Sequence, residues 1–159
     1  MTIVAKPLNA DEFTPYGDVL APPADFGRVY FDQGLRSTRP GAWASLSVSH
    51  AKFLPKLPLE ATVMERHEFS SQSFMPLEVS RWLVVVAPSG VDGGPDGSRA
   101  VAFLAGPGQG VTYHAGTWHH PLTILDRPGR FAVFMWRDGT KTDEEFRTLA
   151  TPFTVEVRD

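Results

Sequence analysis

The sequence predicts an all-β domain, a β-sandwich or β-barrel with two short helices. Three observations favour this class. The chain of 159 residues has 14 glycines and 14 prolines, which recur along most of its length as they do between short strands and turns. Valine supplies β-branched residues, which suit pleated sheets. Short apolar or alternating segments lie between these turn signals. Because the length is that of one domain, a single domain is expected over residues 1–159.

Two kinds of strand pattern occur. Ala44–Ser49 alternates apolar and polar residues, which predicts a half-buried strand. Trp82–Ala87 is continuously apolar, which predicts a strand buried on both faces. The remaining expected strands are Val101–Leu104, Gly110–His114, Thr123–Leu125, Phe131–Trp136 and Phe153–Val157.

Helices are expected at only two places. Asn9–Glu12 and Thr142–Glu145 each place an acidic residue three positions after a capping side chain, the spacing of a capping box. A proline follows each segment within about ten residues, so both helices should be short.

Composition removes several classes of protein and of site. A net charge of −3 argues against a general nucleic-acid binder, which normally carries a basic stripe. The longest apolar run, Trp82–Pro88, is much shorter than the roughly 20 residues of a membrane helix. Met1–Phe13 carries Pro7, Asp11 and Glu12 where a signal peptide would be apolar, so a cytoplasmic protein without a membrane partner is expected. The absence of cysteine excludes disulfides and thiolate sites, which leaves histidine, carboxylate, amide or water for any metal.

One polar cluster contains Glu65, His67 and Gln72. If residues 63–67 form a strand, Glu65 and His67 point to the same face. Gln72 follows after a bend, and the three groups together could begin the ligand set of a divalent metal. The Glu-x-His pair taken alone favours the alternative, which is an exposed strand with ordinary charges.

The second cluster runs from Gly108 to Pro121 and holds His114, His119 and His120. A tight turn at Gly116, where a positive φ costs little, would return His119 to the line of the preceding strand. His119 and His120 are adjacent and face opposite sides of a strand. The alternative is a barrel rim whose imidazoles form structural hydrogen bonds.

Together, the two clusters resemble the two motifs of cupins. The spacing Gly-x(5)-Pro-x-Gly-x(2)-His is matched, with histidine in place of proline, by Gly108, His114, Gly116 and His119. The spacing His-x-His-x(3,4)-Glu is matched, with two ligands replaced, by Glu65, His67 and Gln72. This resemblance implies a single-domain cupin-like β-barrel, a double-stranded β-helix.

Longer segments are similar to the ureidoglycolate lyase family of allantoin degradation. They are Phe13-x-x-Tyr16-Gly17-Asp18-Val19, Glu65-Arg66-His67, Ser71-Gln72-Ser73-Phe74-x-Pro76, Val84–Ala87, Gln109-Gly110-Val111-x-Tyr113-His114 and Trp118–Leu122. The resemblance implies a homodimer that splits ureidoglycolate, a small-molecule substrate of purine catabolism, into glyoxylate and urea. It also implies a divalent metal such as nickel and no organic cofactor.

Two segments depart from the family pattern. The family commonly has an Asn/Arg-containing strand where this chain has Ser45–Ser49. Its Asp-Arg-x-Gly run followed by Asn-Cys corresponds here to Trp136–Asp143, which keeps only Arg137 and Gly139. The exact substrate could therefore differ, or another cation could hold its carboxylate.

The resemblance and the residue chemistry lead to a set of expected roles. A metal or polar core is expected from Glu65, His67, Gln72 and His119. Proton transfer is expected from the histidines His67, His114, His119 and His120, because imidazole titrates near neutral pH. Substrate contacts are expected from Ser71, Tyr113, Trp118 and Arg137, and Arg66 should face away from the site.

Three alternatives remain open. A hydrolase would release ammonia and carbon dioxide in place of urea. A non-catalytic cupin would bind a small carboxylate without turnover. A structural β-barrel dimer module would leave the polar clusters without a chemical purpose.

Overall fold

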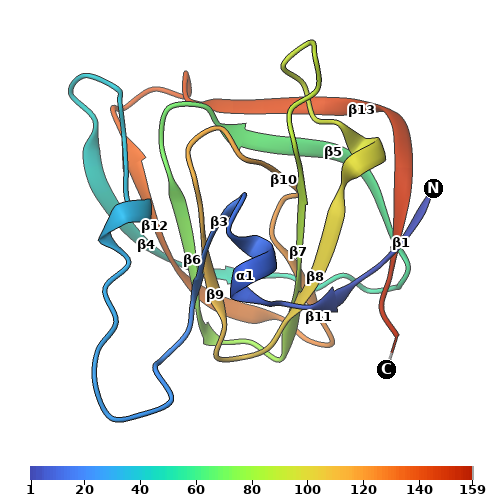
Figure 1. Ribbon diagram of the computed structural model, residues 1–159, viewed down its shortest axis with the longest axis horizontal. Coiled ribbons are helices and arrows are strands. Elements are labelled where there is room, and N and C mark those ends of the chain that lie inside the picture. Colours follow the sequence, from blue (N-terminus) through green and yellow to red (C-terminus); the bar gives the residue numbers. More distant parts are fainter. Residues whose placement is uncertain (159) are drawn as a thin grey trace.

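The computed structural model describes residues 1–158, and the last position of the expected domain, 159, lies outside the described residues. Two β-sheets face each other and enclose an apolar interior, with one short helix against the side of the barrel (Figure 1). The predicted all-β barrel is confirmed.

The larger sheet has eight strands and the smaller has five. The larger sheet contains β1 (Thr2–Val4), β13 (Glu144–Glu156), β5 (Leu59–His67), β10 (Trp118–His119), β7 (Arg81–Ala87), β8 (Val101–Ala105) and β2 (Lys6–Pro7), with β11 (Thr123–Leu125) also paired to β7. The smaller sheet contains β3 (Gly17–Leu20), β9 (Gly110–Tyr113), β6 (Gln72–Glu78), β12 (Gly129–Arg137) and β4 (Trp43–Ala51).

All segments expected to be strands are strands in the structure, although Phe153–Val157 is only the end of the long β13. Continuous pairing explains the extra length: β13 pairs antiparallel with β5 along both halves, with an irregularity between Thr148 and Phe153. The strands β1, β2, β3 and β6 were not expected, because their sequences show no regular alternation.

The first expected helix is confirmed and the second is wrong. Helix α1 (Ala10–Phe13) is capped by Asn9, whose Oδ1 accepts hydrogen bonds from the backbone N–H groups of Asp11 and Glu12. Thr142–Glu145 is instead a turn that enters β13, with Glu144 paired opposite His67. Pairing with β5 there overrides the local capping signal. Single 3-10 turns lie at η1 (Asp32–Gly34) and η2 (Gly97–Arg99).

Strand β4 has its apolar side on the outside. Its serines are paired with β12 residues whose side chains fill the barrel, so Ser47 lies opposite Val133 and Ser49 opposite Phe131. Leu46 and Val48 therefore face outward, with 71% and 69% of their surface exposed. The alternation predicted a strand correctly, but the expected burial of its apolar residues is wrong.

Strand β7 separates two hydrophobic cores, as its continuous apolar sequence predicts. Trp82 and Val84 point into the barrel, where they pack with residues such as Phe131. Leu83 and Val85 point to the other side of the sheet, into a second core closed by side chains of β5, β10 and β13. No helix in the described part of the chain is both long and apolar enough to cross a membrane.

Candidate functional site

A carboxylate–imidazole pair lies inside the barrel, at the ends of β5 and β10, with the His119 side chain 2% exposed and that of Glu65 12% exposed. His119 is paired opposite Glu65 in the sheet, and its Nε2 lies 3.3 Å from Glu65 Oε1. The turn before His119 has Gly116 at φ 82°, and the Gly116 N–H donates to the carbonyl of His67. The expected tight turn is thus confirmed, and it fixes β10 beside the end of β5.

The hydrogen bonds of His119 define its proton positions. Its Nδ1 lies 2.9 Å from the carbonyl oxygen of Thr117, which can only accept, so Nδ1 carries a proton. Nε2 is buried and has no hydrogen-bond partner. Tyr113 stacks on the same ring, with centroids 3.9 Å apart and planes 10° apart, which fixes its orientation. The ring thus directs one unsatisfied nitrogen at the Glu65 carboxylate.

His67 lies beside this pair and is also buried. Its ring centroid is 6.4 Å from that of His119. Burial lowers the pKa of His67, the neighbouring His119 lowers it further, and the carboxylates of Asp143 and Glu65 oppose both effects. A lowered pKa keeps His67 neutral at pH 7, as a proton acceptor requires.

Gln72 reaches the same side of the barrel through the smaller sheet. It is paired directly opposite Tyr113, so the two side chains share the inner face. Its Oε1 is buried without a hydrogen-bond partner. Burying an unpaired carbonyl oxygen is costly, so Gln72 Oε1 is placed to accept a hydrogen bond from a bound polar group.

These residues do not form a metal centre by themselves. Among the residues that the structure describes, no three His, Cys, Asp or Glu side chains are grouped so as to hold a metal ion. Glu65 and His119 are in contact. Glu65, His67 and His119, which are three of the four expected ligands, are not grouped closely enough to hold one ion. The orphaned oxygen and nitrogen are nevertheless atoms that a cation, a water or a substrate proton could satisfy.

A cavity of about 190 Å³ lies at the mouth of the barrel next to His67. Its walls carry three cationic side chains, those of Arg39, Arg137 and Lys141. Arg137 continues the inward-facing register of Val133 on β12, so its expected place near the site is consistent with the structure.

Arg39 fixes this mouth by a dense set of contacts. Its guanidinium is only 9% exposed and is paired with Asp138. It also donates to the hydroxyls of Thr140 and Thr142, and its Nη1 is 3.7 Å from Asp143 Oδ2. The loop before β4 is thereby tied to the turn before β13.

His120 is half-buried beside the core. Its Nδ1 lies 3.0 Å from both the carbonyl of Pro121 and the hydroxyl of Thr123. Burial lowers its pKa, the hydrogen bond to Pro121 and the charge of Glu65 raise it, and His119 lowers it. The ring is therefore held by Pro121 and Thr123, with Nδ1 already hydrogen-bonded.

The structure places two expected site residues elsewhere. His114 is on the outside of the barrel, where its Nε2 is 3.5 Å from Asp18 Oδ2, because it alternates with the inward-facing Tyr113. Trp118 alternates with His119 and fills the second core, so it does not line the barrel interior. Ser71 lies next to the cavity, because its hydroxyl accepts both the backbone N–H of Arg36 and the indole N–H of Trp136, which lines the cavity beside His67.

Arg66 also faces away from the site, as expected. It forms an ion pair with Glu145 at 2.7 Å, and its guanidinium lies 4.5 Å from the centre of the Trp118 ring. These contacts give it a structural role on the outer side of β5.

Asp143 and Arg39 belong to the site region but were missed in the sequence. Asp143 was assigned to a helix, which hid its position beside His67. Arg39 lies in a loop without a motif, and only the fold brings it to Asp138, 99 residues further along the chain.

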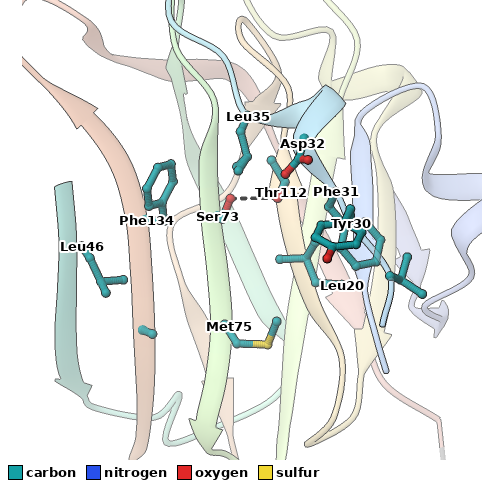
Figure 2. Close-up of a pocket in the computed structure, with 12 residues that line it drawn as sticks. Leu20, Tyr30, Phe31, Asp32, Leu35, Leu46, Ser73, Met75, Thr112 and Phe134 are labelled. Carbon is teal, nitrogen blue, oxygen red and sulfur yellow. Dashed lines mark hydrogen bonds between the residues drawn. The ribbon is translucent and has the colours of Figure 1, made fainter. Parts of the chain in front are cut away.

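A second, apolar pocket of about 320 Å³ lies on the outer face of the smaller sheet. Figure 2 shows Leu46, Phe134 and Met75 on the strands, and Tyr30 and Phe31 at the other side of the pocket, beside Leu20 and Thr112. The hydroxyls of Ser73 and Thr112 are hydrogen-bonded to each other at 2.8 Å on this face. This outer pocket lies on the opposite side of the sheet from Gln72 and Tyr113.

A sequence model of the ureidoglycolate lyase family matches residues 1–156. The chain belongs to the ureidoglycolate lyase family. A protein of Agrobacterium fabrum is 40% identical to it over 158 residues, which cover 99% of this chain and 97% of that protein. The ureidoglycolate lyase of Pseudomonas aeruginosa strain LESB58 is 38% identical, covering 92% of this chain and 91% of the relative. That of Schizosaccharomyces pombe is 29% identical, covering 98% and 96%. The resemblance noted in the sequence is therefore confirmed as family membership.

Proposed function

We propose that this protein is a lyase that cleaves ureidoglycolate into glyoxylate and urea, in the degradation of allantoin and other purine products. The observation that carries the proposal is the His119–Glu65 pair, with its unsatisfied Nε2, inside the barrel of a member of this family. The proposed active site is the space around Glu65, His67, Gln72 and His119, entered past the cationic mouth.

The reaction needs one proton removed and one added. Ureidoglycolate carries a carboxylate, a hydroxyl and a ureido nitrogen on one carbon. Loss of the hydroxyl proton forms the carbonyl of glyoxylate as the carbon–nitrogen bond breaks. The bonding electron pair goes to the nitrogen, which takes a proton and leaves as urea. A base near the hydroxyl and an acid near the nitrogen are therefore sufficient.

Two histidines suit these tasks. A lowered pKa leaves His67 neutral, and it accepts the hydroxyl proton. A proton held between His119 Nε2 and Glu65 Oε1, which are 3.3 Å apart, is passed to the ureido nitrogen. The carboxylate of Glu65 stabilises the protonated ring before the transfer.

The substrate carboxylate requires a cation. Arg137 and Lys141 line the mouth beside His67, whereas Arg39 is already occupied by Asp138. We therefore assign the anion contact to Arg137, with Lys141 adding to the positive potential that draws the substrate in. Tyr113 forms the wall behind His119.

The test is a direct assay. Purified protein is given ureidoglycolate, glyoxylate and urea are followed over time, and spontaneous decomposition is subtracted. Substitutions His67→Ala and His119→Ala should each lower kcat by about a hundredfold or more, as expected for loss of a general acid or base. Equal rates for both variants and the wild type would refute the assignment.

The same assay separates the alternatives. Ammonia in place of urea would identify a hydrolase. Thermal stabilisation by ureidoglycolate without any turnover would identify a binding protein.

Nickel or another divalent metal remains a prediction of the family resemblance. Gln72 Oε1 and His119 Nε2 are buried without hydrogen-bond partners, but within residues 1–158 no three His, Cys, Asp or Glu side chains are grouped so as to hold a metal ion. The mechanism above therefore uses no metal. Metal analysis of the purified protein, with activity measured before and after chelation, tests this prediction.

We further propose that the protein is a homodimer, formed through the outer face of the smaller sheet, and that it works in the cytoplasm. Leu46 and Val48 expose most of their surface on the end strand of that sheet. Contiguous exposed apolar side chains of this kind mark association sites, and a twofold pairing of the same face would bury them. Sedimentation velocity tests the assembly.

A further inference from the structure

The strongest candidate outside the proposed acid–base pair is Asp143, a carboxylate buried beside His67. It is 4% exposed and immediately precedes β13, whose first residue, Glu144, is paired opposite His67. The register of the two strands therefore fixes Asp143 next to the end of β5. Its backbone carbonyl also accepts the N–H of Glu68, which reinforces the position.

The two oxygens of Asp143 have different partners. Oδ1 accepts the backbone N–H of Phe69 at 2.8 Å. Oδ2 is buried without a hydrogen bond. The nearest donors that it faces are His67 Nδ1 at 3.9 Å and Arg39 Nη1 at 3.7 Å. The carboxylate is thus held in place by one oxygen while the other is directed between a guanidinium and an imidazole.

This arrangement favours one tautomer of the His67 ring. Burying a carboxylate oxygen without a donor is costly, and a direct or water-mediated contact from a nearby N–H reduces the cost. A neutral imidazole supplies that donor only when its proton is on Nδ1, which leaves the lone pair on Nε2. A ring that is held in this way is oriented for proton abstraction by Nε2.

We propose that Asp143 is a positioning residue, which holds His67 with its proton on Nδ1 and its Nε2 free to act as the base. The role of His67 as the base rests on the proposed lyase function. Arg39 fixes the other side of Asp143 and ties it to the loop before β4.

Asp143→Asn is the most informative substitution. An asparagine can still accept the N–H of Phe69 through its oxygen, and it then directs an NH₂ donor at His67 Nδ1. The ring should respond by moving its proton to Nε2. We expect kcat to fall about a hundredfold or more, because the base then has no lone pair directed at the substrate, while KM changes by less than about threefold.

The tautomer of the His67 ring is measured separately from activity. Protein labelled with ¹⁵N at histidine is examined by ¹H–¹⁵N correlation spectroscopy of the ring nitrogens, with His67 assigned by its loss in His67→Gln. The wild type should show protonated Nδ1 and unprotonated Nε2, and Asp143→Asn should show the reverse. Asp138→Asn is the matched control, because Asp138 pairs with Arg39 but has no contact with His67. Its kcat and ring form should stay close to those of the wild type.

The outcomes are distinct. A wild-type His67 protonated on Nε2, or a ring form unchanged in Asp143→Asn, overturns the proposal. A fall in kcat that is as large in Asp138→Asn as in Asp143→Asn also overturns it, since loop anchoring would then explain both. If ureidoglycolate is not cleaved at all, the lyase function fails, but the ring spectra still decide the role of Asp143. If Asp143→Asn does not fold, the wild-type spectrum decides it alone.

Discussion

Each face of the five-stranded sheet departs in one place from the pattern expected of a barrel wall, which is apolar inside and polar outside. The inner face carries apolar side chains such as Phe131 along most of its length, but polar ones at the end near the mouth, where Gln72 is buried. The outer face exposes Leu46 and Val48, while the serines that alternate with them on β4 point to the other side of the strand. Polar residues are thus buried where chemistry is proposed, and apolar residues are exposed where assembly is proposed.

The comparison teaches that burial and function are distributed by face in this sheet. A buried unpartnered acceptor destabilises the fold, and an exposed leucine gives no stability to a single chain. The roles proposed above for these departures are catalysis on one face and association on the other. Substitutions on the two faces should therefore have different effects.

The largest effect is expected from emptying the inner face. Phe131 is fully buried and its ring is 5.1 Å from that of Trp82. Phe131→Ala should lower the free energy of unfolding by about 3–5 kcal/mol, whereas Leu46→Ala should change it by less than about 0.5 kcal/mol in the monomer. Chemical denaturation at two protein concentrations measures both and isolates any contribution from assembly. Similar losses for the two variants would remove the distinction between the faces.

The next effect concerns the carboxylate–imidazole pair opposite this face. Glu65→Gln removes the charge beside His119 while keeping its shape. We expect kcat/KM for ureidoglycolate to fall about a hundredfold, because the protonated ring loses its counter-charge. Glu68→Gln is the control, since the Glu68 side chain is half exposed and its ion-pair partner, Arg66, points away from the site. A fall of less than threefold in Glu65→Gln would contradict the proposed acid.

The outer face is tested by introducing a charge. Leu46→Lys would place two like charges near each other across a twofold interface, which costs several kcal/mol. We expect the dimer dissociation constant to rise at least tenfold, with the far-UV circular dichroism unchanged. Val91→Lys is the matched control, because Val91 is fully exposed in a loop. Sedimentation that is unaffected by Leu46→Lys would show that this face is not the interface.

The smallest effect is a dependence of stability on pH that comes from the polar interior. Burial lowers the pKa of His67 and of His120 in the folded protein. Below an ordinary histidine pKa of about 6.5, the unfolded chain therefore binds more protons than the folded one. The free energy of unfolding is therefore unaffected by these rings above this pH. It declines as the pH falls below it, by at most about 1.4 kcal/mol per pH unit for each ring.

His120→Gln isolates one part of this dependence. Denaturation at pH 7.5, 6.5 and 5.5 should give a smaller decline in the variant than in the wild type. Equal declines would show that His120 is protonated as easily in the folded protein as in the unfolded chain.

The local pattern of the sequence predicted most of the strands, because alternation and continuous apolar runs report directly on pairing and burial. It predicted the wrong structure for Thr142–Glu145, where a capping signal competes with pairing to β5 and loses. It also could not tell which side of β4 is buried, since alternation fixes two faces without saying which one meets the core.

The site was predicted only in part, for similar reasons. Spacing brought Glu65 and His119 together, because both lie on strands whose side-chain direction alternates regularly. The positions of His114 and Trp118 follow from the same alternation, which turns both away from the interior. Asp143 reaches the site through a contact between distant segments, and no local pattern records such contacts.

The position of β7 between two cores has a consequence for how the molecule opens. Val84 and Val86 belong to one core, and Leu83 and Val85 to the other. Releasing this strand exposes both hydrophobic layers at once, so its amide hydrogens should exchange with solvent deuterium only when the whole chain unfolds. The short β1 and β2 near the chain start, by contrast, can fray and exchange early without disturbing the proposed active site.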